Sequence, residues 1–120
     1  MVDASDVAFR ELERRRGVTL AYSPMLLASL FSDEAYRQQV DADLKDSCIA
    51  QIAGGLPEVV DAARYLAPKV VAIDVNLGCP QRIAEDRKCG AFTEDPATIV
   101  RALVAAVDVP ITVKIRGQPP

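Results

Sequence analysis

Hydrophobic residues recur along the chain in short runs separated by turn-forming residues, and this pattern predicts alternating helices and strands. A helix is expected over residues 4–16, where Phe9 and Leu12 would face the core and Gly17 would end the helix. β-Branched and aromatic residues then predict a strand over 18–23. The chain would therefore begin with a helix that leads into a strand.

The next part of the chain predicts helical segments on both sides of a second strand. Residues 24–40 are expected to be largely helical, with a break near Ser32, which can cap a second short helix. The apolar run 48–53 predicts the strand, and Pro57 begins a helix that Pro68 stops. The inner face of that helix would carry Val59, Val60, Ala63 and Leu66.

The second half of the sequence repeats this strand–helix pattern. Residues 69–75 are nearly all apolar, which is typical of a strand buried on both faces of a parallel sheet. Asp95 can cap a helix that starts at Pro96, and the alternation over 110–116 predicts a fourth strand. No glycine-rich phosphate-binding turn is present, which counts against a nucleotide-binding doubly wound sheet.

These units predict an α/β fold, a partial TIM (β/α)8 barrel of about four parallel βα units. A complete barrel needs eight units and about 250 residues. All four strands should be parallel and adjacent in sequence order. The expected core comprises Leu20, Ile49, Ile52, Val71, Ile73, Ile111 and Val113 from the strands, covered by Val60, Leu66, Ile99 and Leu103 from the helices.

Composition and charge narrow the classes of function. The 120 residues are 50% hydrophobic and 26% charged, as in one globular domain, and the net charge of −3 gives no overall signature of nucleic-acid binding. Histidine is absent, and Cys48, Cys79 and Cys89 form no C-x-x-C pair, so we expect no metal site. No signal peptide or membrane span is recognisable, which predicts a cytoplasmic protein.

Polar residues gather at the expected C-terminal ends of the strands, where (β/α) barrels carry their active sites. Each of them alone has an ordinary structural explanation, but their presence at four strand ends favours a functional site. In chain order these residues are Ser23 and Met25, then Gln51, then Asn76, Gly78 and Cys79, and finally Lys114 and Arg116.

Five short segments carry a resemblance to a known family. They are YSPM at 22–25, AQIAG at 50–54, NLGCP at 76–80, CGAF at 89–92 and VKIRG at 113–117. In this order and spacing they resemble the tRNA dihydrouridine synthases, which are FMN-dependent (β/α)8 enzymes. The residues around the segments at 22–25 and 76–80 are closer to the eukaryotic type that modifies the D-loop. The resemblance implies that residues 1–120 are a fragment of the FMN-binding TIM-barrel catalytic domain.

The resemblance also implies a reaction, in which the C5=C6 bond of a uridine in tRNA is reduced by reduced FMN, with NADPH as electron source and a cysteine as proton donor. A thiol with an unperturbed pKa of about 8.5 is mostly protonated near pH 7 and suits that role. By position in the motifs, the site residues would be Cys79 as the catalytic proton donor, Met1, Gln51 and Lys114 for the cofactor, and Asn76 and Arg116 for the substrate.

The resemblance implies further segments on both sides of the sequence. The family's first barrel strand would precede Met1, and the later strands, the phosphate-binding loops and a helical domain that grips tRNA would follow Pro120. The tRNA would be bound mainly by those segments. The loop 81–92 is expected to be mobile so that a tRNA strand can enter.

Two alternatives remain open at the level of sequence. One is another FMN-dependent pyrimidine oxidoreductase barrel, because dihydroorotate and dihydropyrimidine dehydrogenases carry a similar Asn-x-Ser-Cys-Pro strand end, although Gly78 and the VKIRG segment favour the tRNA enzyme. The other is a truncated, inactive fragment that self-associates through its open sheet edges. A flavin absorbance spectrum of the purified chain would separate the enzymes from the inactive fragment.

Overall fold

A computed structural model describes residues 4–117 and contains one four-stranded sheet among them. Neighbouring strands are parallel and follow the sequence order β1-β2-β3-β4, as expected. The strands are β1 (Leu26–Leu27), β2 (Ile49–Ala53), β3 (Ala72–Asn76) and β4 (Ile111–Lys114). Met1, which was expected to contact the cofactor, lies outside the described residues.

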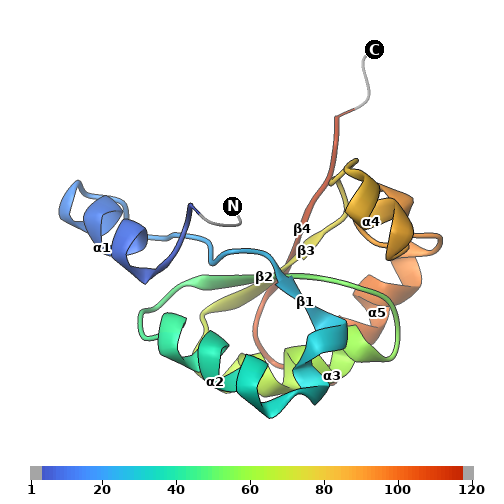
Figure 1. The fold of residues 1–120 in the computed structure, drawn as a ribbon, viewed down its shortest axis with the longest axis horizontal. Helices are drawn as coiled ribbons and strands as arrows, with labels where there is room; N and C mark the ends of the chain where they lie inside the picture. The colour runs from blue at the N-terminus through green and yellow to red at the C-terminus, as the bar shows by residue number, and fades with distance from the viewer. Residues whose placement is uncertain (1–3, 118–120) are drawn as a thin grey trace.

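Most of the helices that follow the strands form a layer on one side of the sheet (Figure 1). The α-helices are α1 (Val7–Arg15), α2 (Glu34–Asp43), α3 (Glu58–Leu66), α4 (Arg82–Asp86) and α5 (Pro96–Ala106), and the short 3-10 helices are η1 (Ala28–Ser32), η2 (Ala67–Lys69) and η3 (Gly90–Phe92). Figure 1 shows α2, α3 and α5 together below the sheet, with α1 to one side. Parallel strands joined through helices on one face confirm the α/β fold of a partial TIM barrel.

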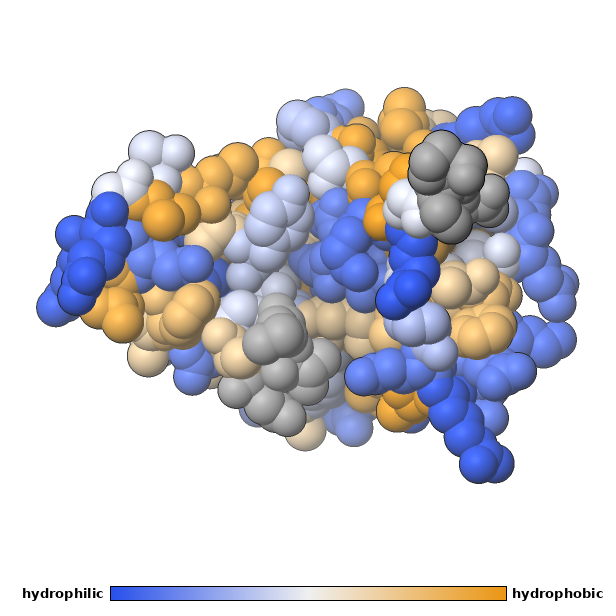
Figure 2. Space-filling view, turned by 90° about the horizontal axis from the view of Figure 1, so that it is seen from above, coloured by the Kyte–Doolittle hydropathy of each residue, from blue (hydrophilic) through white to orange (hydrophobic). Residues whose placement is uncertain are grey.

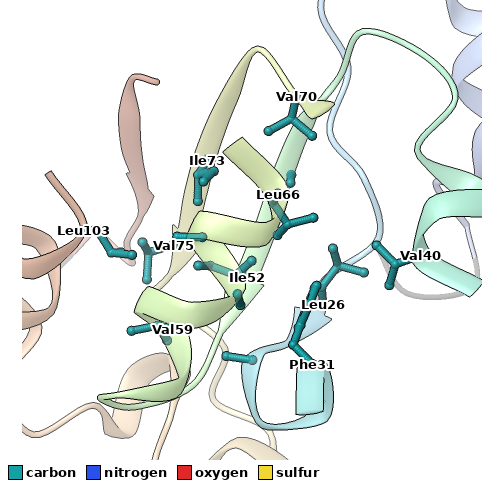
Figure 3. Packing of buried hydrophobic residues seen from close by; sticks show 14 of the residues in the cluster. Leu26, Phe31, Val40, Ile52, Val59, Leu66, Val70, Ile73, Val75 and Leu103 are labelled. Atoms are coloured by element: carbon teal, nitrogen blue, oxygen red, sulfur yellow. The ribbon is translucent and has the colours of Figure 1, made fainter. Parts of the chain in front are cut away.

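The core lies between the sheet and the helix layer. Ile52, Ile73 and Val75 point from β2 and β3 toward the helices, where they meet Leu66 and Leu103 (Figure 3). All five side chains are almost completely buried, and burial of one such side chain contributes about 1.5–3 kcal/mol. The predicted core positions Ile52, Ile73, Leu66 and Leu103 are therefore confirmed, and Val75 joins them although it was not predicted.

The strand predicted over 18–23 is not formed as such. Within it, Tyr22 makes an isolated parallel bridge to Ile49, and β1 begins only at Leu26. Leu20 is half exposed, so its assignment to the core is wrong. The β-branched residues favour extended structure locally, but the partner strand decides which extended residues join the sheet.

Two further core assignments are wrong. Val71 and Val113 are both more than 40% exposed. Val71 precedes the first paired residue of β3, and Val113 lies on β4, which among the described residues pairs with β3 alone. One side of β4 is therefore left open at the edge of the described sheet.

Local capping follows the sequence closely, with one shift. The region 24–40 is only partly helical, because Leu26–Leu27 form the strand β1, but the predicted break is present between η1 and α2. Asp33 rather than Ser32 caps α2, since its carboxylate accepts a hydrogen bond from the Ala35 amide (2.8 Å). Asp95 caps α5 as predicted and accepts from the Thr98 amide (3.0 Å).

The segment 81–92 was predicted to be a loop, and the structure instead contains regular elements there. It includes the one-turn helix α4 and the 3-10 helix η3. Figure 1 shows α4 beyond the C-terminal ends of β3 and β4, next to the edge where the polar strand-end residues lie. The expected mobility of this segment stays a prediction.

Helix α1 is attached to the rest of the chain by a buried arginine. The expectation that Phe9 and Leu12 face the core is wrong, since they are 45% and 52% exposed. Arg10 is fully buried instead, and its guanidinium donates hydrogen bonds to Asp43 (3.0 Å) and Asp46 (2.6 Å). The amphipathic pattern of α1 is therefore reversed, with a charged side chain inside and apolar side chains outside.

The charges of this cluster stabilise each other. Burial alone lowers the pKa of Arg10, but its hydrogen bonds to Asp46 and Asp43 outweigh this, so the pKa lies above the usual value. Burial likewise raises the pKa of Asp46, yet hydrogen bonds from Arg10 and Arg14 lower it below its usual value. The ionised forms of both partners are thus favoured in the folded chain.

Replacing Arg10 with methionine should lower the free energy of unfolding by about 3 kcal/mol, because Asp43 loses its ion-pair partner and Asp46 keeps only Arg14. Urea unfolding followed by circular dichroism measures the change. The control is Arg15→Met in the same helix, where an exposed ion pair to Glu11 (3.2 Å) should contribute little. Equal losses in the two variants would contradict the anchoring role of Arg10.

Candidate active site

The parallel register aligns polar residues in rows across the sheet. Gln51 of β2 lies opposite Asp74 of β3, and Asp74 lies opposite Thr112 of β4. One step further along, Asn76 lies opposite Lys114. Because side chains alternate along a strand, these residues share the face that points away from the helix layer.

An open groove of about 1030 Å³ lies over these rows. In the view from above in Figure 2, hydrophilic residues gather near the centre of the face, between hydrophobic ones. The structure brings together five of the predicted site residues, since the groove is lined by Gln51, Asn76, Cys79, Lys114 and Arg116 among others, whereas Ser23 is not in its lining and Met1 lies outside the described residues. It also includes Asp74 and Thr112, which were not predicted.

Asn76 holds the turn that carries Cys79. Its Oδ1 accepts hydrogen bonds from the backbone amides of Gly78 (3.1 Å) and Cys79 (3.0 Å). Its Nδ2 donates to Gln51 Oε1 (3.3 Å) and Met25 Sδ (3.4 Å). All four hydrogen-bonding positions of this amide are therefore occupied by the chain itself, and a substrate contact by Asn76 stays a prediction.

Asp74 is a site residue that the sequence reasoning missed. It is only 2% exposed, and its two carboxylate oxygens accept hydrogen bonds from Gln51 Nε2 (2.8 Å) and Thr112 Oγ1 (2.7 Å). The available signal was its position, since it is the single acidic residue within the apolar run 69–75. A buried carboxylate of this kind requires hydrogen-bonding partners, so it marks a polar network.

The end of β3 lies close to the segment after β4. A Cβ atom added at Gly78 would lie 3.2 Å from the Ile115 carbonyl carbon, so only glycine permits this approach without displacement. Arg116 Nε donates to the Gly78 carbonyl oxygen (2.9 Å), which leaves the terminal guanidinium nitrogens open to the groove. The Lys114 backbone carbonyl accepts a hydrogen bond from the Leu77 amide (2.9 Å), whereas its exposed side chain makes no hydrogen bond or ion pair within residues 4–117.

The three thiols occupy different environments. Burial, together with the charge of Asp46, raises the pKa of Cys48 to about 11. Burial also raises the pKa of Cys89, and the neighbouring Cys79 adds to the shift. Cys79 alone among these cysteines lines the groove and is partly exposed, with Sγ 3.9 Å from Gln81 Oε1. It is therefore the thiol that a molecule in the groove can reach.

Residues 4–117 give no support for a metal site or a membrane-spanning helix. No cluster of three or more His, Cys, Asp or Glu side chains is arranged there to hold a metal ion. No helix in this range is long and apolar enough to cross a membrane.

Comparison with known families gives one match over nearly the whole chain. The family model described as dihydrouridine synthase (Dus) matches residues 1–118. The tRNA-dihydrouridine(16/17) synthase of Schizosaccharomyces pombe is 38% identical over 99% of this chain and 32% of its own length. The Saccharomyces cerevisiae protein of the same name is 39% identical over 97% of this chain and 30% of its own length.

Bacterial relatives match as well. The tRNA-dihydrouridine synthase B of Shewanella oneidensis is 36% identical over 97% of this chain and 39% of its own length. Identity is 38–40% with the fungal and rodent 16/17 synthases and 32–36% with the bacterial proteins of this name. The chain thus spans about a third of the length of the curated relatives it matches.

Gly90→Ala should disturb Cys79 directly. Gly90 has a φ of +62°, and a Cβ atom there would lie 2.7 Å from the Cys79 carbonyl oxygen and 3.0 Å from its Cβ. We expect a loss of stability of about 1–2 kcal/mol from the left-handed backbone, with a further loss from the contact. We also expect a changed rate of Cys79 alkylation by iodoacetamide, measured by peptide mass spectrometry.

The matched control is Gly55→Ala, because a Cβ atom at Gly55 meets nothing within 4 Å. This variant should leave the alkylation rate of Cys79 unchanged. An unchanged rate in Gly90→Ala as well would show that the packing of Gly90 does not set the position of the thiol.

Proposed function

The chain belongs to the dihydrouridine synthase family, and from this premise we propose that residues 1–120 form part of an FMN-binding catalytic barrel that reduces uridine in tRNA. The observation that carries the proposal is the groove at the C-terminal ends of the strands, where one accessible thiol, Cys79, lies with Gln51 and Lys114. The activity is proposed for the full-length protein, because the chain spans only about a third of its relatives.

The residues present fit a flavin mononucleotide. Cofactor sites commonly enclose about 300–1,000 Å³, and the groove of about 1030 Å³ lies at the upper end of that range. After its bonds to Asp74 and Asn76, Gln51 retains one N–H and one lone pair, which suits the donor–acceptor edge of a flavin ring. Lys114 and Arg116 add positive charge that suits electron-rich ring atoms or phosphate.

Cys79 would hold the proton for the reaction. FMN, when bound and reduced, would supply a hydride for C6 of the uracil ring, and the Cys79 thiol would donate its proton to C5. The backbone of Cys79 is held on both sides, by Asn76 Oδ1 at its amide (3.0 Å) and by the Ala91 amide at its carbonyl (3.0 Å). This fixed main chain aims the thiol into the groove, which is the geometric requirement for general acid catalysis.

The proposals for the substrate and the electron source are supported by the names of the relatives. The printed names of several relatives include NAD(P)(+), and we propose NADPH as the electron source here. The uracil base must leave the RNA stack to enter the groove, as in other enzymes that act on bases. Arg116 would contact the substrate, while most tRNA contacts would come from segments outside this sequence. We place the full-length protein in the cytoplasm as part of the same proposal.

The alternatives are weakened to different extents. The family match weighs against a free-pyrimidine dehydrogenase. Self-association remains a second candidate for the isolated chain, because Val113 and Ile115 are exposed beside the open edge of β4.

Cys79→Ala in the full-length protein should leave FMN binding and its reduction by NADPH intact, because the proton donor acts only afterwards. Dihydrouridine formation should fall by about 10²- to 10⁴-fold, the usual contribution of a general acid. Single-turnover oxidation of the reduced protein by tRNA measures the step. Cys48→Ala, which removes a buried thiol outside the groove, is the control. Wild-type kinetics in Cys79→Ala would remove this thiol from the reaction.

Lys114→Ala should weaken FMN retention. Loss of a hydrogen bond from a charged donor costs about 1.5–3 kcal/mol, and the exposure of Lys114 favours the low end, or about a tenfold higher dissociation constant. Titration by flavin fluorescence measures the affinity. Lys69→Ala is the control, since Lys69 pairs with Asp41 (2.6 Å) away from the groove. If Lys114→Ala and wild type bind FMN equally, Lys114 is not a cofactor contact.

A further inference from the structure

Asp74 is a buried carboxyl group that the proposed reaction does not use. It is 2% exposed at the middle of the polar row, and both of its carboxylate oxygens are hydrogen-bonded. Its neighbours along β3, Ile73 and Val75, point into the apolar core on the opposite face. An apolar residue at position 74 would avoid the desolvation of a carboxylate, so the charge calls for a reason.

The two ends of an amide side chain are nearly identical in shape, so hydrogen-bonding partners decide which end points where. An ionised carboxylate only accepts hydrogen bonds, so Asp74 selects the Nε2 end of Gln51 (2.8 Å). The Oε1 end of Gln51 then faces Asn76 and accepts from its Nδ2 (3.3 Å). Asn76 in turn presents Oδ1 to the amides of Gly78 and Cys79.

These hydrogen bonds link three strands and converge on Asp74, which accepts from both sides. Thr112 donates to the second oxygen of Asp74 (2.7 Å), which restrains the carboxylate from the β4 side. Every donor in this series of hydrogen bonds meets an acceptor. Reversal of the Gln51 amide would therefore place oxygen against oxygen at Asp74 and nitrogen against nitrogen at Asn76. The orientation of Gln51 is therefore determined from both ends.

We propose that Asp74 is a positioning residue that sets the order of donor and acceptor which Gln51 presents to the flavin ring. Through Gln51 and Asn76 it also supports the turn that carries Cys79. The inference rests on the proposed function for the identity of the ligand, but the hydrogen-bond chain itself exists without a ligand.

The first test needs no FMN. In the wild-type protein labelled with ¹⁵N-glutamine, the Gln51 side-chain N–H that faces Asp74 should exchange with solvent at least about tenfold more slowly than those of Gln38, since a buried, charge-assisted hydrogen bond must first open. Gln38 is an internal control, because its amide lies exposed at 3.5 Å from Glu34. Equal exchange rates would overturn the proposal, whether or not FMN binds.

The second test is a double-mutant cycle on FMN affinity. Asp74→Leu should weaken FMN binding about tenfold in the wild-type background, but less than about twofold when Gln51→Leu is already present, because the effect of Asp74 passes through Gln51. Equal factors in both backgrounds would mean that Asp74 acts independently of Gln51 and would overturn the proposal.

Asp74→Asn should rescue the affinity to within about threefold of wild type, since an asparagine can accept from Gln51 and donate to Thr112 in the same geometry. A loss in Asp74→Asn as large as in Asp74→Leu would show that the charge matters and the orientation does not. If Asp74→Leu does not fold, the exchange measurement and Asp74→Asn still decide the question.

The matched control is Asp41→Leu. Asp41 also accepts two side-chain hydrogen bonds, from Tyr65 (2.7 Å) and Lys69 (2.6 Å), but it lines no part of the groove. This variant should be less stable to urea and bind FMN as the wild type does. A weaker affinity in Asp41→Leu equal to that in Asp74→Leu would mean that general loss of stability explains both. Absence of FMN binding in the wild type would refute the proposed function and leave the exchange result to decide the role of Asp74.

Discussion

The parallel pairing of β2 with β3 and of β3 with β4 requires that residues in register point to the same face of the sheet. Ile73 and Val75 therefore pack under the helices, while Asp74 between them faces the groove with its partners Gln51 and Thr112. A slip of one residue would exchange the two sets and bury the polar row in the apolar core. Core and site thus depend on the same register.

This constraint makes hydrogen bonding at the site obligatory. A buried polar group without a partner costs about 1–3 kcal/mol. Within the described residues, no buried side-chain nitrogen or oxygen lacks a hydrogen bond. Asp74, Gln51 and Asn76 are joined by hydrogen bonds to one another. Asn76 also accepts hydrogen bonds through Oδ1 from the backbone amides of Gly78 and Cys79. The position of the reactive thiol is therefore linked to the polar row.

The same principle attaches helix α1 by a different chemistry. Arg10 is buried because Asp43 and Asp46, more than 30 residues away in the chain, supply acceptors for its guanidinium. With this charge inside, Phe9 and Leu12 remain on the outer surface of the helix. At both places a buried ionic group is tolerated because its partners are held by separate elements of the fold.

The sequence by itself determined the elements whose pattern is local. The apolar runs of β2 and β3, the apolar faces of α3 and α5, the cap at Asp95 and the polar strand ends all follow from periodicity and residue type within a few positions. The polar strand ends also included several of the residues that line the groove, Cys79 among them.

Only the tertiary structure decided which charges are buried and which extended residues join the sheet. Arg10 lies inside, Leu20 lies outside, and Asp74 meets Thr112 across 38 positions of the chain. Burial of a charge is favourable only when distant partners compensate its lost hydration, and no local pattern records where those partners will lie. Gln51, Asn76, Cys79, Lys114 and Arg116 could thus be placed in the groove from sequence, whereas Asp74, Thr112 and the hydrogen bonds that orient the site required the assembled sheet.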